Sequence, residues 1–159
     1  MIKINVIAVG KVKEKYFQNG IGEYAKRLKG VCEFKITEIE EENYKKVSDS
    51  LIEEIKLKEG KKILSSVDFK GYVFAMAIEG KKLSSVNFAK EIKKLGDNGT
   101  GVISFIIGGS YGLSDEVKKR ADKLISFSDM TFPHTLFRLI LVEQIYRAFS
   151  INGGTPYHK

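Results

Sequence analysis

The sequence is poor in the residues that form covalent cross-links and metal sites. It has one cysteine, Cys32, two histidines, His134 and His158, and no tryptophan. A single cysteine excludes an internal disulfide and a multi-cysteine metal site, so we expect Cys32 to be a small, half-buried residue of a strand. The two histidines lie far apart in the chain and share no metal-ligand spacing. The sequence therefore predicts no metal site.

Long hydrophobic runs are also absent. No stretch approaches the ~20 apolar residues that a membrane-spanning helix needs. The first ten residues, MIKINVIAVG, lack the small-residue cleavage pattern of a signal peptide, so we interpret them as a first strand. These features predict a cytoplasmic protein that has no membrane segment.

The net charge is positive but modest. The 159 residues fit one domain, 1–159, and 27 basic against 20 acidic residues give a formal charge of +7. A basic chain attracts polyanions, and the phosphates of nucleic acids are its usual partners. We expect many lysines, including Lys11, Lys13 and Lys15, to lie among acidic residues on helix surfaces. Charge alone therefore gives only weak support for nucleic-acid binding.

Strand and helix patterns alternate along the whole chain. The predicted strands are 2–9, 31–39, 72–78, 102–107 and 124–127. The predicted helices are 13–28, 50–64, 84–95, 114–122 and 136–149. A capping box of Ser50 and Glu53 favours the start of the second helix, and Ser84 or Ser85 caps the third. This alternation predicts an α/β fold, a mainly parallel sheet flanked by helices.

Ligands of such sheets bind at the carboxyl ends of strands, where three loops are candidates. They are Glu79-Gly80, Gly108–Gly112 and Ser128–Pro133. The glycine loop lacks the G-x-G-x-x-G spacing of a dinucleotide site, and no Walker motif is present. Glycines at a strand end serve either a tight turn or the close approach of a flat ligand, and both interpretations remain open. We expect Pro133 in the first turn of the last helix.

The last helix is apolar around most of its circumference, which is typical of a helix buried on several sides. We expect it to pack on the sheet and on a second subunit. Glu143 and Arg147 stand four residues apart and pair on one face, or else Arg138 or Arg147 grips a phosphate. The tail ends in Tyr157, His158 and Lys159, which is either a frayed end or a set of groups that stack on and hydrogen-bond a base.

Several of these segments together resemble the SPOUT methyltransferases, whose C-terminal part forms a deep trefoil knot. The segments that carry the resemblance are AVGKVK (8–13), IIGGSYGL (106–113), FSDMTFPHTLFR (127–138), EQIYRAF (143–149) and YHK (157–159). The resemblance covers essentially the whole chain. It implies a SPOUT-like knotted α/β fold, a homodimer packed through the C-terminal helix, and S-adenosylmethionine as methyl donor, held bent in the knot loops.

The resemblance also implies a substrate and a set of binding residues. The expected reaction is methylation of N3 of a pseudouridine in 23S large-subunit ribosomal RNA, on the assembled ribosome. Leucine is the expected residue where this chain has Met76, and both side chains suit an apolar wall. By match to the family pattern, the expected cofactor-binding residues are Met76, Gly108, Phe127, Ser128, Asp129, Met130, Thr131 and Phe132.

The catalytic residues follow less directly from the pattern. The imide nitrogen must lose its proton, and a histidine titrates in the right range, so we expect His158 with Tyr157 to serve as the base. His134 is a second choice with a more structural character. We expect Arg138 to stabilise developing charge, and Arg147, His134 and Lys159 to contact RNA. The alternatives are a non-catalytic ribosome- or RNA-binding protein, a small-molecule nucleotide-binding enzyme, and a knotted methyltransferase of another RNA.

Overall fold

The computed structural model describes residues 1–159 as a five-stranded parallel sheet with helices on both faces. The strand order is β2-β1-β4-β3-β5, and every neighbouring pair is parallel. The strands are β1 (Lys3–Val9), β2 (Glu33–Ile39), β3 (Tyr72–Lys82), β4 (Val102–Ile107) and β5 (Lys123–Ser126). The helices are α1 (Lys15–Leu28), α2 (Asp49–Ser66), α3 (Ser85–Asp97), α4 (Asp115–Arg120) and α5 (His134–Asn152). The predicted α/β fold is confirmed.

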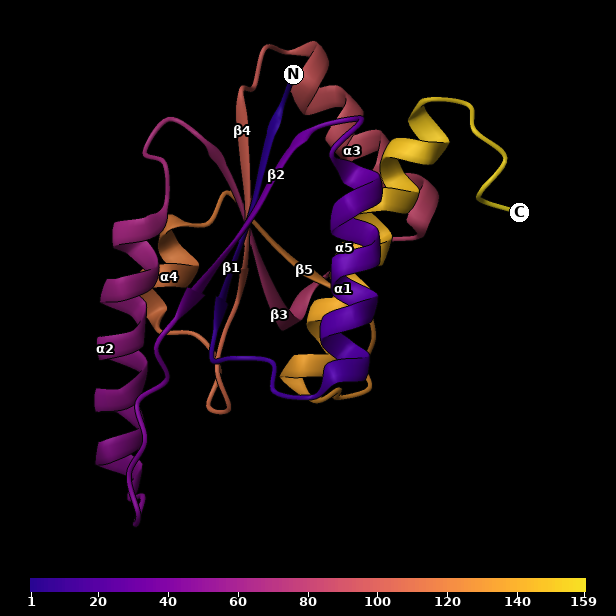
Figure 1. The fold of residues 1–159 in the computed structure, drawn as a ribbon. Helices are drawn as coiled ribbons and strands as arrows, with labels where there is room; N and C mark the ends of the chain where they lie inside the picture. The colour runs from indigo at the N-terminus through magenta and orange to yellow at the C-terminus, as the bar shows by residue number, and fades with distance from the viewer.

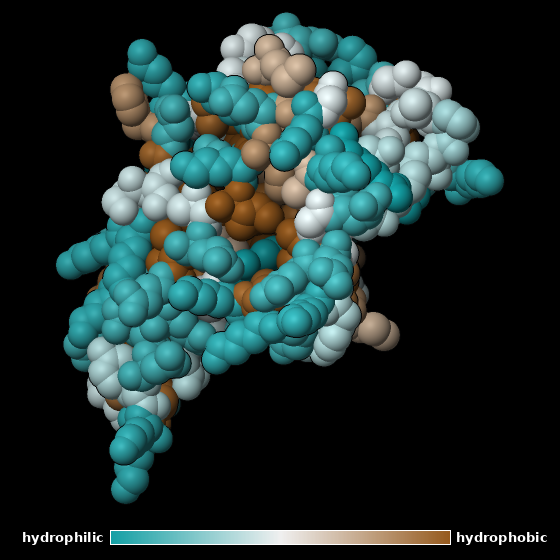
Figure 2. Space-filling model, viewed as in Figure 1, coloured by the Kyte–Doolittle hydropathy of each residue, from teal (hydrophilic) through white to brown (hydrophobic).

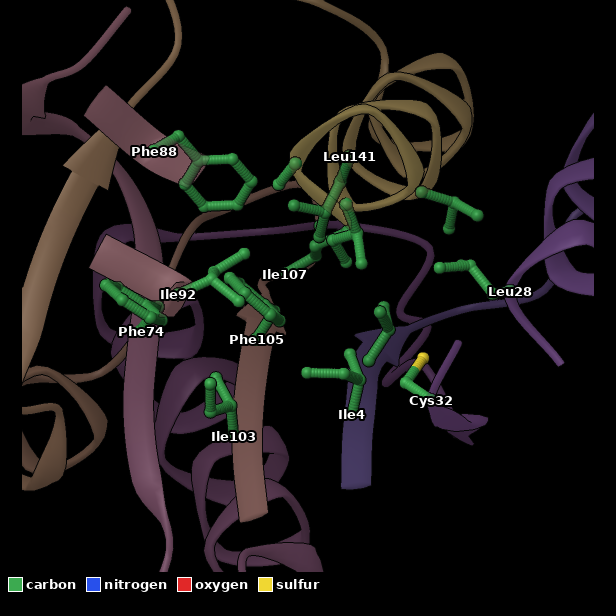
Figure 3. Close-up of a cluster of buried hydrophobic side chains, with 14 of the residues drawn as sticks. Ile4, Leu28, Cys32, Phe74, Phe88, Ile92, Ile103, Phe105, Ile107 and Leu141 are labelled. Carbon is green, nitrogen blue, oxygen red and sulfur yellow. The ribbon is translucent and has the colours of Figure 1, made fainter. Parts of the chain in front are cut away.

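The helices form two layers, one on each face of the sheet. Figure 1 shows α2 and α4 on one side and α1, α3 and α5 on the other. The side with α1, α3 and α5 holds the larger core, in which the rings of Phe74 and Phe105 stack at 5.1 Å with Phe88 edge-on to both (Figure 3). Cys32 lies in the same core, just before β2. It is more buried than predicted, and burial raises the pKa of its thiol to about 12.

Serine caps begin several helices. The hydroxyl oxygens of Ser84 and Ser114 accept backbone N–H bonds from Asn87 and Val117 at the starts of α3 and α4. The predicted cap of α2 was wrong, because Ser48 rather than Ser50 accepts the N–H of Leu51, at 3.3 Å. Ser48 has the extended backbone that a cap needs, and the helix therefore begins earlier than predicted.

Strand β3 continues past its predicted end at Ile78. After an irregularity between Met76 and Lys81, Lys81 and Lys82 pair with Ile125 and Ser126 of β5. At Gly80 a Cβ atom would lie 2.6 Å from the backbone nitrogen of Ile125, so only glycine permits this close approach of β3 to β5. The sequence pattern missed the extension because its partner strand comes from a distant part of the chain. None of the helices is both long enough and apolar enough to cross a membrane.

Candidate functional site

A cavity of about 560 Å³ opens at the carboxyl edge of the sheet. Its walls come from the end of β3, the glycine loop after β4, and the segment between β5 and α5. Hydrophilic side chains dominate the face seen in Figure 2, and apolar residues show as smaller patches between them. All three loops that the sequence pointed to thus contribute to one cavity. This is the arrangement expected where ligands bind to an open parallel sheet.

The glycine loop is both a tight turn and a cavity wall. Gly112 has a positive φ of 85°, and its N–H donates to the carbonyl oxygen of Gly109 at 3.1 Å. Gly108 lines the cavity, and a Cβ atom there would lie 2.9 Å from the Leu113 side chain and 3.0 Å from the carbonyl carbon of Gly112. The tight turn is therefore present, and the same loop borders the cavity.

The segment between β5 and α5 forms the opposite wall. The hydroxyl of Ser126 donates to the carbonyl oxygen of Ser128 at 3.0 Å, and Ser128 Oγ accepts the N–H of Met130 at 3.0 Å. These bonds fold the segment into a turn around the cavity. All of the predicted cofactor-binding residues line the cavity except Asp129. The Asp129 side chain is 79% exposed and forms an ion pair with Lys82.

The cavity has an apolar wall with a polar rim. Met76, Ile107 and Phe137 contribute apolar surface, and the rim carries an ion pair in which Lys118 Nζ lies 2.6 Å from Glu79 Oε1. The hydrogen bond from Lys118 lowers the pKa of Glu79. Sequence reasoning missed Lys118 because a lysine on a short surface helix gives no local signal. Only the packing of α4 beside the end of β3 brings it to the cavity.

His134 and Arg138, the two candidate residues near the start of α5, lie in different surroundings. His134 begins α5 and lines the cavity, whereas Pro133 precedes the helix as its N-cap rather than lying in its first turn as predicted. Arg138 is only 3% exposed, and it does not line the cavity. Its guanidinium lies 2.6 Å from Glu38 Oε2 and donates to the carbonyl oxygen of Gly10 at 3.0 Å. This contact joins α5 to the ends of β1 and β2.

The C-terminal tail lies far from the cavity of its own chain. In Figure 1 the C-terminus lies beyond the far end of α5, whereas the glycine loop lies at the opposite end of the sheet. The 19 residues of α5 span about 28 Å, which separates the tail from His134. Within one chain, the structure therefore does not bring the predicted catalytic tail and the predicted cofactor-binding residues together.

The tail is held on α5 by a polar network. Arg147 pairs with Glu143, as one of the two open interpretations predicted, at 2.5 Å, and its Nη1 lies 3.1 Å from His158 Nδ1. The hydroxyl of Tyr157 donates to Glu143 Oε1 at 2.9 Å and lies 3.1 Å from that of Tyr24. Burial, followed by these hydrogen bonds, raises the pKa of Tyr157. Tyr157 is therefore protonated at neutral pH, and Lys159 lies exposed beyond it.

A buried carboxyl group lies behind the glycine loop. Glu59 of α2 is 3% exposed and accepts the N–H of Glu42 at 3.1 Å. A Cβ atom on Gly109 would lie 3.0 Å from Glu59 Oε1, so the carboxyl group packs directly against the loop. Burial raises the pKa of Glu59. Folding therefore shifts the protonation equilibrium of this side chain toward the protonated form.

Replacing Glu59 with glutamine should change how stability depends on pH. A raised pKa means that the folded state binds more protons than the unfolded state, so wild-type stability falls as pH rises above the unfolded value of about 4.3. In Glu59→Gln this loss is absent. Urea unfolding at several pH values should show the variant gaining stability relative to wild type between about pH 4 and pH 7. If the unfolding free energies of wild type and variant changed with pH in the same way, the raised pKa of Glu59 would be contradicted.

The comparisons with known proteins agree with this architecture. Residues 2–158 match the family described as predicted SPOUT methyltransferase, and the chain belongs to this family. Family membership supports the predicted α/β fold class, and the resemblance seen in the sequence is confirmed. No group of three or more histidine, cysteine, aspartate or glutamate side chains is arranged to hold a metal ion.

Its relatives have a more specific name. The chain is 54% identical to the ribosomal RNA large subunit methyltransferase H of Ligilactobacillus salivarius and 53% identical to that of Limosilactobacillus reuteri. Each alignment covers 99% of this chain and 100% of the relative. A solved structure of a probable methylase family protein from Haemophilus influenzae is similar in fold, with a TM-score of 0.52 and 12% identity. The superposition covers 99% of this chain and 70% of the Haemophilus influenzae chain.

Proposed function

We propose that this protein transfers a methyl group from S-adenosylmethionine to N3 of a pseudouridine in 23S ribosomal RNA, on the assembled ribosome in the cytoplasm. Family membership and the names of its relatives support the reaction class and the RNA. The observation that carries the proposal is the single cavity at the carboxyl edge of the sheet. It collects the predicted cofactor residues from β3, the glycine loop and the segment after β5.

The cavity fits S-adenosylmethionine in size and chemistry. Its volume of about 560 Å³ lies within the usual range of small-molecule sites. The apolar surface of Met76 and Phe137 suits an adenine ring, and Gly108 permits close approach of the backbone. Ser128 and Thr131 supply hydroxyl groups for polar parts of the ligand. When bound, the cofactor supplies an electrophilic methyl group on a sulfonium sulfur.

The protein must hold the target nitrogen in line and accept its proton. Proximity and alignment alone contribute about 7–11 kcal/mol to such reactions. His158 is our proposed base, and protonated Tyr157 orients the target ring by hydrogen bonding. Arg147 and Lys159 beside them contact the RNA. His134 in the cavity wall is the alternative base, and Arg138 acts by fixing the start of α5 rather than by touching the substrate.

A second copy of the chain completes this site in our proposal. Helix α5 keeps apolar side chains only partly covered, among them Leu136 and Ile140, and these are suited to a two-fold interface. If two α5 helices pack antiparallel, the C-terminal end of one lies beside the N-terminal end of the other. The tail of each chain then reaches the cavity of its partner. A homodimer through α5 therefore reconciles the distance between tail and cavity with one active site.

Cofactor binding tests the proposal before any RNA is added. Calorimetry with S-adenosylmethionine should show one site per chain, and Thr131→Trp should abolish binding because the indole fills the cavity. The control is Lys61→Trp on the exposed surface of α2, which should bind like wild type. A native-state ligand also raises the unfolding temperature. A folded wild-type protein that shows neither effect would favour the non-catalytic RNA-binding alternative.

A further inference from the structure

The loop between β1 and α1 leaves the sheet beside the candidate site. Figure 1 shows this loop passing the start of α5 at the carboxyl edge of the sheet. Gly10, its first residue, has a positive φ of 92°, and a Cβ atom there would lie 3.6 Å from Nε2 of His134. His134 lines the cavity. Lys11 and the residues after it therefore emerge next to the cavity wall.

The loop is held in place at several points. The N–H of Gly10 donates to the carbonyl oxygen of Ile39 at 2.7 Å, and its own carbonyl accepts from Arg138 at 3.0 Å. The side chain of Val12 is buried in the core, and its carbonyl accepts from Gln18 Nε2 at 2.7 Å. Little backbone freedom is left to lose when a ligand binds, which favours affinity.

Exposed lysines alternate with covered residues along this fixed backbone. Lys11, Lys13 and Lys15 are exposed, whereas Val12 is buried and Glu14 is partly buried. None of these lysines takes part in an ion pair. The expectation that they lie on a helix surface was wrong for Lys11 and Lys13, which precede α1, whereas Lys15 is the first residue of that helix. Their positive charges are free to attract an anion.

Two nearby acidic groups already have partners, whereas Glu14, which stands between Lys13 and Lys15, has a buried carboxylate oxygen without a hydrogen-bond partner. Glu38 pairs with Arg138, and Glu41 accepts the hydroxyl of Ser110 at 3.3 Å. The first turn of α1 contains no acidic residue, although the positive end of a helix dipole is stabilised by acids and destabilised by lysine. The stability of α1 therefore does not explain Lys15.

An exposed aromatic ring lies beside these lysines. Tyr16 is 68% exposed, and its ring packs edge-on against Phe17 at 4.5 Å, which limits its movement. Lysines that neutralise phosphates next to an aromatic ring that stacks on a base are the usual means of holding single-stranded RNA. An acidic protein surface would use the lysines but would give the exposed ring no comparable role.

We propose that Lys11, Lys13 and Lys15 bind successive phosphates of the ribosomal RNA strand that presents the target base, and that Tyr16 stacks on an unpaired base of that strand. The identity of the RNA rests on the proposed function. The loop acts as a fixed cationic guide that leads the strand past His134 into the cavity.

The test compares Lys11→Gln, Lys13→Gln and Lys15→Gln combined with a matched control. The control is the combination of Lys26→Gln, Lys29→Gln and Lys94→Gln, which removes the same charge from exposed, unpaired lysines at the opposite end of the sheet. Sedimentation measures binding to ribosomes and to 23S RNA across a range of salt concentrations, and does not require methyl transfer. Calorimetry with S-adenosylmethionine and methyl-transfer kinetics complete the comparison.

The loop variant should bind ribosomes at least tenfold more weakly than wild type, and its KM for ribosomes should rise by the same factor. Its plot of log affinity against log salt should be shallower by about 2, since each lost phosphate contact removes about 0.7. Its affinity for S-adenosylmethionine should be unchanged, and the control variant should match wild type throughout. Tyr16→Ala should weaken RNA binding without changing the salt slope.

Equal losses in the loop and control variants, or an unchanged loop variant, would overturn the proposal. A wild-type protein that binds ribosomes through this loop but transfers no methyl group would support the loop and refute the proposed function. A wild-type protein that methylates ribosomes, together with a loop variant that binds them normally, would support the proposed function and refute the role of the loop. The two failures are therefore distinguishable.

Discussion

Mixing two inactive variants should restore activity. One is Thr131→Trp, which fills the cavity, and the other is a chain that ends at Pro156 and so lacks Tyr157, His158 and Lys159. If the tail serves the partner's cavity, each heterodimer has one site with an intact cavity and an intact tail. Unfolding and refolding the two together should then give about a quarter of the wild-type rate, because about half of randomly formed symmetric dimers are mixed. Methyl transfer at saturating substrate measures this.

The controls for this experiment are simple. Each variant refolded alone should be inactive but folded and dimeric by light scattering and circular dichroism. If the tail served the cavity of its own chain, every site in the mixture would carry one defect, and mixing would restore nothing. An inactive mixture that contains heterodimers would therefore contradict the composite site.

Replacing Gly80 with alanine should be strongly destabilising. The added methyl group would lie 2.6 Å from the Ile125 nitrogen and 2.7 Å from the backbone carbons of Leu124 and Ile125. None of these atoms belongs to a flexible side chain, so β3 and β5 must separate at the irregularity in their pairing. Overpacking of this kind costs about 3 kcal/mol, and we expect at least that loss of unfolding free energy in urea.

Gly96→Ala is the matched control for this substitution. Gly96 lies near the end of α3, and a Cβ atom there would meet nothing within 4 Å. Alanine is the better helix former, so this variant should be more stable than wild type by about 0.5 kcal/mol. Similar stabilities of the two variants would show that the contact between Gly80 and β5 is less tight than the structure indicates.

Local patterns predicted most of the individual elements but not how they meet. The continuous apolar runs of β3 and β4 and the serine cap of α3, predicted at Ser84 or Ser85, depend on neighbouring residues, and they were predicted from the sequence. Ser48 and Ser50 both suit a helix cap, and only the backbone conformation selects Ser48. The extension of β3 to Lys82 depends on pairing with β5, which no local pattern encodes.

The candidate site also has a part that the sequence predicted and a part that depends on distant contacts. The resemblance identified a set of residues that the fold brings to one cavity, apart from Asp129, whose side chain turns outward to Lys82. Arg138 looked available for a phosphate, but its partner Glu38 lies 100 residues away in sequence, so neither this ion pair nor the burial of Arg138 gave a sequence signal. The distance between tail and cavity likewise follows only from the direction of α5.

Methyl transfer to defined ribosomes tests the central claim most directly. Ribosomes from cells that lack the modification would be incubated with labelled S-adenosylmethionine, beside free 23S RNA and separated subunits. Mass spectrometry of the digested RNA would then locate the label. We predict label on N3 of one pseudouridine of 23S RNA, and only with assembled ribosomes. No label on any RNA, from a folded and dimeric protein, would contradict the assignment of this chain as a ribosomal RNA methyltransferase.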